Sequence, residues 1–223
     1  MDIRIDPFGP DALLVRHTPQ GHEAAFARGL ALQRHLEQHP PVGLAEITPG
    51  FTTLLLEFTP GTRPDPRWLS VVLGAAFRGI KSTVAPERTL EIPVIYDGPD
   101  LPAVAAKARL SVREVIALHA AGNYRVALLG FAPGFPYLSG LDRRLHTPRL
   151  ETPRTSVPTG SVAIGGEHTG IYPAATAGGW NLIGRTPLNI VDTTLARSAD
   201  PKAFLFQPGD AVRFVAIPQE AST

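Results

Sequence analysis

Three arginines within residues 130–187 are the side chains best suited to binding an anion. Arg149 and Arg154 each follow a proline, and Arg185 precedes Thr186-Pro187. Because proline fixes φ, each guanidinium starts from a restricted set of positions. A planar guanidinium donates paired hydrogen bonds to a carboxylate or phosphate. The spacing therefore predicts a site for a carboxylate, carboxyphosphate or phosphate group. The alternative is that each arginine bonds loop carbonyl groups that would otherwise be unpaired.

Two glycine pairs in the same stretch, Gly165-Gly166 and Gly178-Gly179, allow a ligand or another chain to approach the backbone closely. Trp180 follows the second pair, where it either stacks on a ligand or fills the interior. The chain contains no G-x-x-x-x-G-K-[ST] motif and no G-x-G-x-x-G motif before a helix. A P-loop or Rossmann turn of this chain is therefore not expected to hold ATP.

Other catalytic arrangements are poorly supported. Ser161, His168 and Asp192 supply the residue types of a hydrolase triad, but no G-x-S-x-G elbow accompanies them. Glu167 and His168 are adjacent and would point apart on a strand, so we expect no metal site. The absence of cysteine excludes disulfides, thiolate ligands and cysteine nucleophiles.

The overall composition is that of an ordinary globular protein. The chain has 223 residues, 43% hydrophobic and 18% charged, with a formal net charge of +1. This charge gives no reason to expect nucleic acid or a membrane surface as a partner. The N-terminus alternates and carries acidic residues, unlike a signal peptide, and no apolar run reaches membrane-spanning length. We therefore expect a cytoplasmic protein.

Short strands between glycine- and proline-rich turns dominate the second half of the chain. An apolar run at residues 124–131 is followed by candidate strands at residues 161–164, 170–172, 181–183, 188–191, 204–206 and 212–217. Such regularly spaced short strands favour a closed or nearly closed β-barrel. A helix precedes them, opened by a capping box at Ser111 and Glu114. His119, near the end of this helix, is expected to stabilise the terminus as a cation rather than to act in catalysis.

The first half combines strands with two helices. Apolar residues recur at helical spacing over residues 22–39, and Asp65 with Pro66 begins a second helix. Trp68 is expected in the core. The order of elements predicts an α+β sandwich with a ferredoxin-like arrangement. The turn Gly98-Pro99-Asp100 marks the joint, so we expect an N-terminal α+β domain at 1–97 and a barrel domain at 98–223.

An ordered set of motifs over nearly the whole chain resembles the Kip inhibitor family. This family is also called allophanate hydrolase subunit 1 and is equated with the B subunit of the bacterial ATP-dependent 5-oxoprolinase. The principal motifs are Gly130-Phe131-Ala132-Pro133-Gly134-Phe135-Pro136-Tyr137-Leu138, Pro148-Arg149, Thr152-Pro153-Arg154, Gly160-Ser161-Val162-Ala163-Ile164, Gly170-Ile171-Tyr172-Pro173, Gly178-Gly179-Trp180 and Ile183-Gly184-Arg185-Thr186-Pro187.

The resemblance implies an N-terminal α+β domain and a C-terminal cyclophilin-like β-barrel. It also implies two partners from 5-oxoprolinase: the C subunit, of the allophanate hydrolase subunit 2 type, and the A subunit, of the LamB/YcsF type. The assembly would use ATP to convert 5-oxo-L-proline to L-glutamate. Arg149, Arg154 and Arg185 would be catalytic, stabilising carboxylate or phosphoryl charge. The identity of the ATP-binding subunit, the physiological amide and the stoichiometry stay open.

The candidate residues for binding substrate or partner lie in the same stretch: Phe135, Tyr137, Ser161, Gly166, His168, Tyr172, Gly179 and Trp180. Two positions depart from the family pattern. His168 stands where the family usually has Gln, and Ala177 stands where it usually has Pro. A histidine replaces an amide donor only in part, and alanine loosens the entry to the loop, so the departures affect ligand details.

Two alternative functions remain open. The family name records inhibition of a sporulation sensor histidine kinase, and an aromatic, proline-rich loop surface suits a protein partner. A regulatory binding module is therefore the main alternative. Prolyl isomerisation by a cyclophilin-like barrel is a third possibility, although similarity of fold is a weak reason to assign it.

Overall fold

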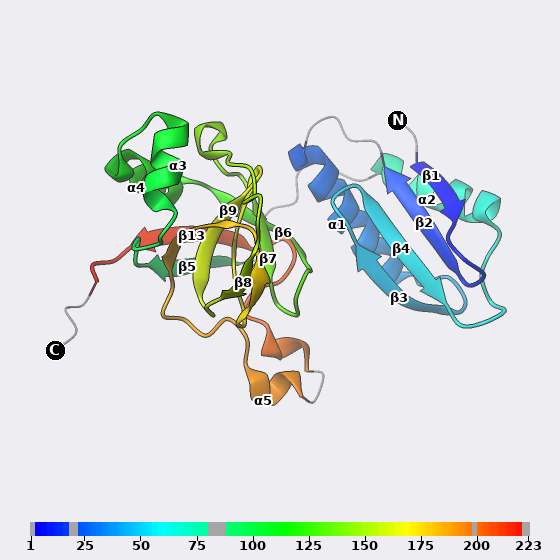
Figure 1. Ribbon diagram of the computed structural model, residues 1–223. Coiled ribbons are helices and arrows are strands. Elements are labelled where there is room, and N and C mark those ends of the chain that lie inside the picture. The colour runs from blue at the N-terminus through cyan, green and yellow to red at the C-terminus, as the bar shows by residue number, and fades with distance from the viewer. Residues whose placement is uncertain (1–2, 18–21, 80–87, 198–199, 220–223) are drawn as a thin grey trace. The chain divides into compact units, whose positions relative to one another are not determined.

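Two sheets with separate hydrophobic cores divide the chain into two units, Met1–Ala85 and Pro86–Thr223. The computed structural model describes residues 3–17, 22–79, 88–197 and 200–219. Figure 1 shows the elements of each unit.

The first unit is an antiparallel sheet packed against two helices. Its strands lie in the order β1-β2-β4-β3. Their bounds are β1 Ile3–Pro7, β2 Ala12–His17, β3 Leu44–Pro49 and β4 Thr53–Phe58. The helices are α1 His22–Gln38 and α2 Pro66–Gly79. Buried side chains alternate along β2 and β4 and meet leucines of both helices in one core.

One expectation for this unit is not confirmed, and another is wrong. A ferredoxin-like arrangement is not confirmed, because its elements run βαββαβ whereas two strands precede α1 here and α2 follows the last strand. The expected core residue Trp68 has a side chain that is 53% exposed. The buried stripe of α2 instead runs through Leu69 and Leu73, which are one helical turn apart.

The second unit is built on a seven-stranded sheet in the order β12-β9-β10-β7-β6-β13-β5, accompanied by the pair β11-β8. The strands of the large sheet are β5 Thr89–Val94, β6 Tyr124–Leu129, β7 Pro136–Ser139, β9 Ser161–Gly165, β10 His168–Ile171, β12 Asn181–Arg185 and β13 Ala211–Ala216. The pair consists of β8 Arg154–Val157 and β11 Thr176–Gly178.

The two edges of the large sheet meet, which makes it a nearly closed barrel. Ile95, just after β5, exchanges two backbone hydrogen bonds of 2.9 Å with Arg185 of β12. Gly98 donates a further backbone bond to Ile183. A Cβ atom on Gly98 would collide with the backbone of residues 182–184, so glycine permits this close approach. The expected barrel is thus observed in its coarse form.

The unit also contains short helices outside the sheet. They are α3 Leu101–Ala108, α4 Val112–Ala121, η1 Arg143–Leu145, α5 Thr193–Ala196 and η2 Pro201–Ala203. The capping box predicted at Ser111 and Glu114 is present at the start of α4. In Figure 1, α3 and α4 lie together at one end of the unit, where they contact β12 and β13 respectively.

His119 of α4 differs from its predicted role at a helix end. Its ring is fully buried and stacks on Phe214, with hydrogen bonds to Tyr96 and Thr169. Burial lowers the pKa of His119 to about 3, so the ring is neutral. It therefore does not stabilise the helix terminus as a cation.

The position of β5 differs from the expected division of the chain at residues 97 and 98. That division placed this strand in the first domain, but β5 pairs in parallel with β13 over residues 89–94 and 211–216. The sheet of the second unit therefore includes a strand that precedes the turn at Gly98.

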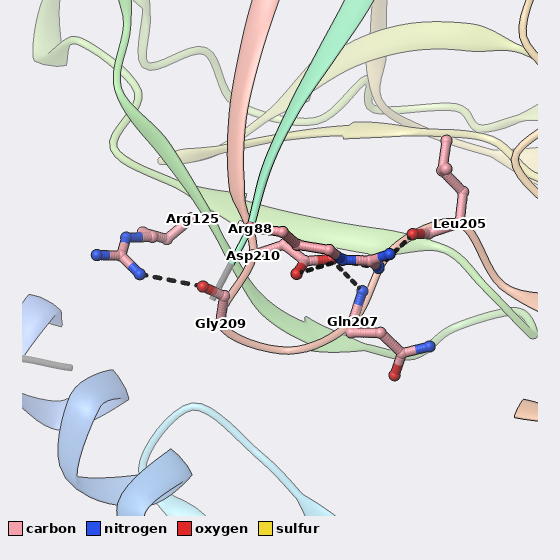
Figure 2. A network of polar contacts seen from close by, with 6 residues as sticks. All are labelled: Arg88, Arg125, Leu205, Gln207, Gly209 and Asp210. Atoms are coloured by element: carbon pink, nitrogen blue, oxygen red, sulfur yellow. Dashed lines mark hydrogen bonds and ion pairs between the residues drawn. The ribbon is translucent and has the colours of Figure 1, made fainter. Parts of the chain in front are cut away.

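A polar network at the start of β5 joins it to the turn before β13 (Figure 2). Arg88 donates from Nε and a terminal nitrogen to the two oxygens of Asp210, at 2.8 and 2.7 Å. It also bonds the carbonyl of Leu205, while the amide of Gln207 donates to Asp210. Arg125 of β6 bonds the carbonyl of Gly209 in the same turn. The network therefore joins the start of β5 to the start of β13, at one end of the parallel pairing.

Candidate functional site

An aromatic pocket is the first candidate site of the second unit. It encloses a cavity of about 50 Å³. Its lining residues are Phe131, Phe135, Tyr137, Arg149, Tyr172, Gly178, Gly179 and Trp180. They come from the loops and strands of residues 131–180, which the barrel brings to one place. Five of the residues predicted to bind substrate or partner are among them.

The rings of the pocket pack edge to face. Phe135 is the central ring, with centroids 5.2 Å from Tyr172 and 5.3 Å from Trp180. Tyr137 of β7 lies 5.1 Å from Phe135 and 5.5 Å from Trp180. Such contacts are favourable because the positive edge of one ring meets the negative face of another. These contacts hold the rings that line the pocket in place without a ligand.

Three glycines make room for these rings. A Cβ atom on Gly165 would collide with the indole of Trp180, and one on Gly178 would collide with the ring of Tyr172. A Cβ atom on Gly170 would lie 3.0 Å from ring atoms of Phe135. The glycine-rich composition of this stretch is therefore explained in part by aromatic packing.

We expect Gly165→Ala to displace Trp180 and to lower the free energy of unfolding by about 1–3 kcal/mol, the usual cost of overpacking. Urea denaturation and the emission of Trp180 measure the two effects. Gly166→Ala is the matched control, because no atom lies within 4 Å of its Cβ position although its φ is 64°. It should cost roughly 1 kcal/mol in backbone strain and leave Trp180 unchanged. Unchanged emission in Gly165→Ala would contradict the prediction.

Phe131 stands at the mouth of the pocket in a strained conformation. Its φ is 68°, and the amide of Ala132 donates to the carbonyl of Gly130 at 2.8 Å, as in a γ-turn. Its ring is 62% exposed and lies 5.5 Å from Phe135. A positive φ at a bulky residue costs about 1–3 kcal/mol and is concentrated at binding sites. Strain and exposure together point to a ligand or partner at this mouth.

Arg149 supplies positive charge at the same pocket. Its guanidinium carbon lies 5.8 Å from the centre of the Trp180 ring, within range of a cation–π contact. No carboxylate of residues 3–17, 22–79, 88–197 or 200–219 forms an ion pair with Arg149. Burial raises the pKa of Tyr172, although the nearby Arg149 opposes that shift.

A second cleft of about 380 Å³ lies beside the closure of the barrel, and we call it the polar cleft after its charged and hydroxyl side chains. Its lining residues are Asp97, Gly98, Pro99, Arg154, Ser156, Pro158, Thr159, Ser161, Leu182, Gly184 and Arg185. Arg154 bonds Asp100 at 2.7 Å, and Arg185 bonds Asp97 at 2.9 Å. The second oxygen of Asp100 accepts from the amide of Leu182. Two arginine–aspartate pairs thus attach the turn at residues 97–100 to β8 and β12.

A protein-family model described as carboxyltransferase domain, subdomain C and D, matches residues 3–202. This chain belongs to that family. The B subunit of 5-oxoprolinase from Bacillus subtilis (strain 168) is 36% identical over 230 residues, covering 97% of this chain and 94% of the relative. The resemblance to the Kip inhibitor, or allophanate hydrolase subunit 1, family is thereby confirmed.

Two solved structures share the carboxyltransferase fold. TTHA0988 is 39% identical to this chain, with a TM-score of 0.75 over 96% of the chain. The chain spans 41% of the length of TTHA0988. K. lactis urea amidolyase gives a TM-score of 0.74 over 97% of this chain and 15% of its own. At 21% identity, the latter comparison shows the fold alone.

The carboxyltransferase fold does not bring the three predicted arginines into one site. Arg154 and Arg185 share the polar cleft, whereas Arg149 lies at the aromatic pocket. Sequence reasoning missed the partners Asp97 and Asp100, and it missed Phe131 as a residue that lines the aromatic pocket. The turn at residues 97–100 is the sequence feature that could have indicated the two aspartates. For Phe131, the feature is a bulky residue inside a glycine- and proline-rich motif.

The remaining predicted residues do not line the aromatic pocket, although the ring of His168 lies 6.4 Å from that of the lining residue Tyr137. Ser161 lines the polar cleft. Gly166 is an exposed residue between β9 and β10 that exchanges two backbone hydrogen bonds with Thr147. His168 begins β10 with its ring 3.6 Å from Glu167. Asp192 accepts backbone bonds at the start of α5, which gives it a structural role.

Clusters of metal-binding side chains are absent from the part of the chain that the structure describes. Among those residues, no group of three or more His, Cys, Asp or Glu side chains could hold a metal ion. Within the same ranges, none of the helices has the length and apolar character needed to cross a membrane.

Proposed function

We propose that this chain is the B subunit of an ATP-dependent 5-oxoprolinase complex that converts 5-oxo-L-proline to L-glutamate. The observation that carries the proposal is the relative named as the B subunit of 5-oxoprolinase, which matches 97% of the chain. The second unit would be a cyclophilin-like barrel. The partners would be the C subunit, of the allophanate hydrolase subunit 2 type, and the A subunit, of the LamB/YcsF type. ATP would be used by the assembled complex.

The proposed chemistry is opening of a lactam. ATP would transfer its γ-phosphoryl group to the lactam oxygen and leave as ADP, which activates the ring carbon. Water would then add to that carbon, the ring C–N bond would break with protonation of the nitrogen, and inorganic phosphate would leave. Arg154 is partly buried and Arg185 is half exposed, so an anionic group could reach N–H groups of either in the polar cleft. Because each already pairs with an aspartate, we assign them hydrogen bonds to developing negative charge rather than capture of a full counter-charge.

Reconstitution of the complex tests the proposal. The chain is combined with the A and C subunits of the same organism, and glutamate formation and ATP hydrolysis are measured with 5-oxo-L-proline. Activity is expected only when all three chains are present. Arg154→Ala should lower kcat at least about tenfold, as loss of a transition-state donor does. Arg213→Ala, at an exposed pair on β13, is the control. Full activity without this chain would refute the proposal.

A regulatory binding module is the second candidate. The strained and exposed ring of Phe131 is the observation that favours it, because exposed aromatic residues commonly anchor protein partners. The test is co-purification with sensor histidine kinases of the host and measurement of their autophosphorylation. Absence of binding and of inhibition would remove this candidate.

A further inference from the structure

We propose that the aromatic pocket binds the five-membered lactam ring of 5-oxo-L-proline, with Arg149 pairing with its carboxylate. The inference rests on the proposed function. It places the lactam ring and its carboxylate in the aromatic pocket and leaves the phosphoryl group to the polar cleft. Arg154 adjoins both, because it lines the cleft and donates to the carbonyl of Trp180 at 3.5 Å. It is carried by the juxtaposition of a small aromatic cavity and an arginine without a carboxylate partner among the described residues.

The charges distinguish Arg149 from the other two predicted arginines. Arg154 and Arg185 are paired with Asp100 and Asp97, so their charge is largely neutralised where they lie. Arg149 has a cation–π contact with Trp180 instead. A carboxylate at this mouth would therefore gain a full counter-charge and a planar guanidinium suited to two parallel hydrogen bonds.

The cavity has the size and lining for a small ring. A cavity of about 50 Å³ has room for roughly three to five waters, which is close to the space that a five-membered ring with its substituents needs. Phe135, Tyr172 and Trp180 line the cavity with ring atoms, although most of each ring is buried in the core. Gly179 carries no side chain, and the atoms nearest its Cβ position lie 3.7 Å away, so the polar amide of the lactam can approach the main chain there.

The strained mouth fits the same ligand. Phe131 is held at positive φ with its ring 6.3 Å from Tyr172 and 5.5 Å from Phe135. A ring entering the cavity would cover part of the apolar surface that Phe131 leaves in water. The favourable free energy of covering this apolar surface would offset the cost of the strained backbone at Phe131, as at other preorganised sites.

Binding to the full chain is measured through Trp180. The chain has two tryptophans, and Trp68→Phe removes the other one, which is exposed in the first unit. With 5-oxo-L-proline we expect a saturable change of Trp180 emission. In the same background, Arg149→Gln should weaken binding about 10–100-fold, the effect of losing a charge-assisted pair. Arg149→Lys should be intermediate, because it keeps the charge and loses the planar fork.

Two controls assign the effect to the carboxylate. Arg113→Gln removes an exposed arginine of α4 that lines neither cavity, and it should leave binding unchanged. The lactam 2-pyrrolidinone lacks the carboxylate, so it should bind weakly and equally to wild-type and Arg149→Gln proteins. Equal weakening of both ligands by Arg149→Gln would overturn the proposal, as would absence of a saturable signal in both the chain and the complex.

The reconstituted complex separates failure of this inference from failure of the proposed function. Arg149→Gln is expected to raise KM for 5-oxo-L-proline about 10–100-fold, whereas Arg113→Gln is not. If activity requires the chain but KM is unchanged in Arg149→Gln, the pocket assignment is wrong and the proposed function stands. If the ligand binds the chain but activity does not need the chain, the proposed function is wrong. Loss of ligand binding on adding the A and C subunits would show that a partner chain fills the pocket, which also overturns the inference.

Discussion

Replacing Arg88 with alanine is expected to lower the free energy of unfolding of the second unit by about 2–4 kcal/mol. Arg88 pairs with both oxygens of Asp210, whose side chain is only 5% exposed. The substitution would leave a buried carboxylate without its counter-charge, although the amide of Gln207 would still donate to it. The effect falls toward the lower end of the range for buried pairs because Arg88 itself is 45% exposed.

Arg213→Ala is the matched control for Arg88→Ala. Arg213 of β13 pairs with Glu91 of β5 at 3.5 Å, so it joins the same two strands, but both side chains are 64% exposed. Its loss should cost less than about 1 kcal/mol, as for surface pairs generally. Urea denaturation followed by Trp180 emission in the Trp68→Phe background measures both variants.

The double variant Arg88→Ala/Asp210→Asn tests the cause of the effect. An amide has no charge to desolvate and can still accept from Gln207, so the double variant should recover part of the lost stability. Equal losses in Arg88→Ala and Arg213→Ala would show that burial of Asp210 contributes nothing to the stabilising effect of the network in Figure 2.

Structures formed by residues that are close in sequence can be predicted from the sequence itself. The capping box at Ser111 and Glu114 forms because its bonds lie within one helical turn. The aromatic residues of the glycine-rich stretch are expected to form a binding surface, and Phe135, Tyr172 and Trp180 do meet in one pocket. The barrel brings these three rings together, so their presence in one pocket can be expected once the short strands indicate a barrel.

Long-range pairing cannot be read in the same way. β5 and β13 are more than a hundred residues apart in sequence, and nothing local to β5 indicates its parallel partner. The pairing of Arg154 and Arg185 with aspartates also depends on barrel closure, which brings residues 97–100 to β12. A proline before an arginine restricts where the guanidinium begins but does not say which carboxylate it meets.

For the first sheet, the expected order of helices and strands is close to the observed order, yet the expected ferredoxin-like arrangement is not confirmed. The order ββαββα follows from a βαββαβ chain if the last strand is moved to the front, and the strand neighbours β1-β2-β4-β3 are then retained. The sequence also indicates a strand at residues 89–96 that would complete the first sheet, but the second unit contains it as β5 Thr89–Val94. Hydrophobic periodicity locates strands, whereas the choice of sheet is made by tertiary packing.

A second large effect is expected on acidification: lowering the pH should destabilise the second unit through His119. Thr169 donates its hydroxyl to the carbonyl of Ala163, so its oxygen accepts from Nε2–H of His119 at 2.9 Å. Nδ1 of His119 then accepts from the hydroxyl of Tyr96 at 2.8 Å. Burial raises the pKa of Tyr96 and of Tyr124, so both phenols stay protonated beside the ring. The site holds a neutral imidazole and offers no counter-charge to an imidazolium.

The sign of the effect follows from the lowered pKa of His119, about 3 in the folded protein against 6.5 as its ordinary value. Below pH 6.5 the unfolded chain binds a proton that the folded chain does not, so stability falls with pH until about pH 3. The expected loss is roughly 2–3 kcal/mol between about pH 7 and pH 4.5. Asp142, whose pKa Arg144 lowers to about 2, contributes only below its ordinary value of 3.8.

His119→Gln should remove most of this pH dependence, because a neutral amide can replace both hydrogen bonds and does not titrate. Urea denaturation at several pH values, followed by Trp180 emission in the Trp68→Phe background, reports on the second unit alone. This matters because burial also lowers the pKa of His17 in the first unit. His146→Gln, at an exposed histidine, should retain the wild-type slope. An equally steep slope in His119→Gln would mean that other groups bind the protons, and the neutral buried imidazole would then not be the source of acid sensitivity.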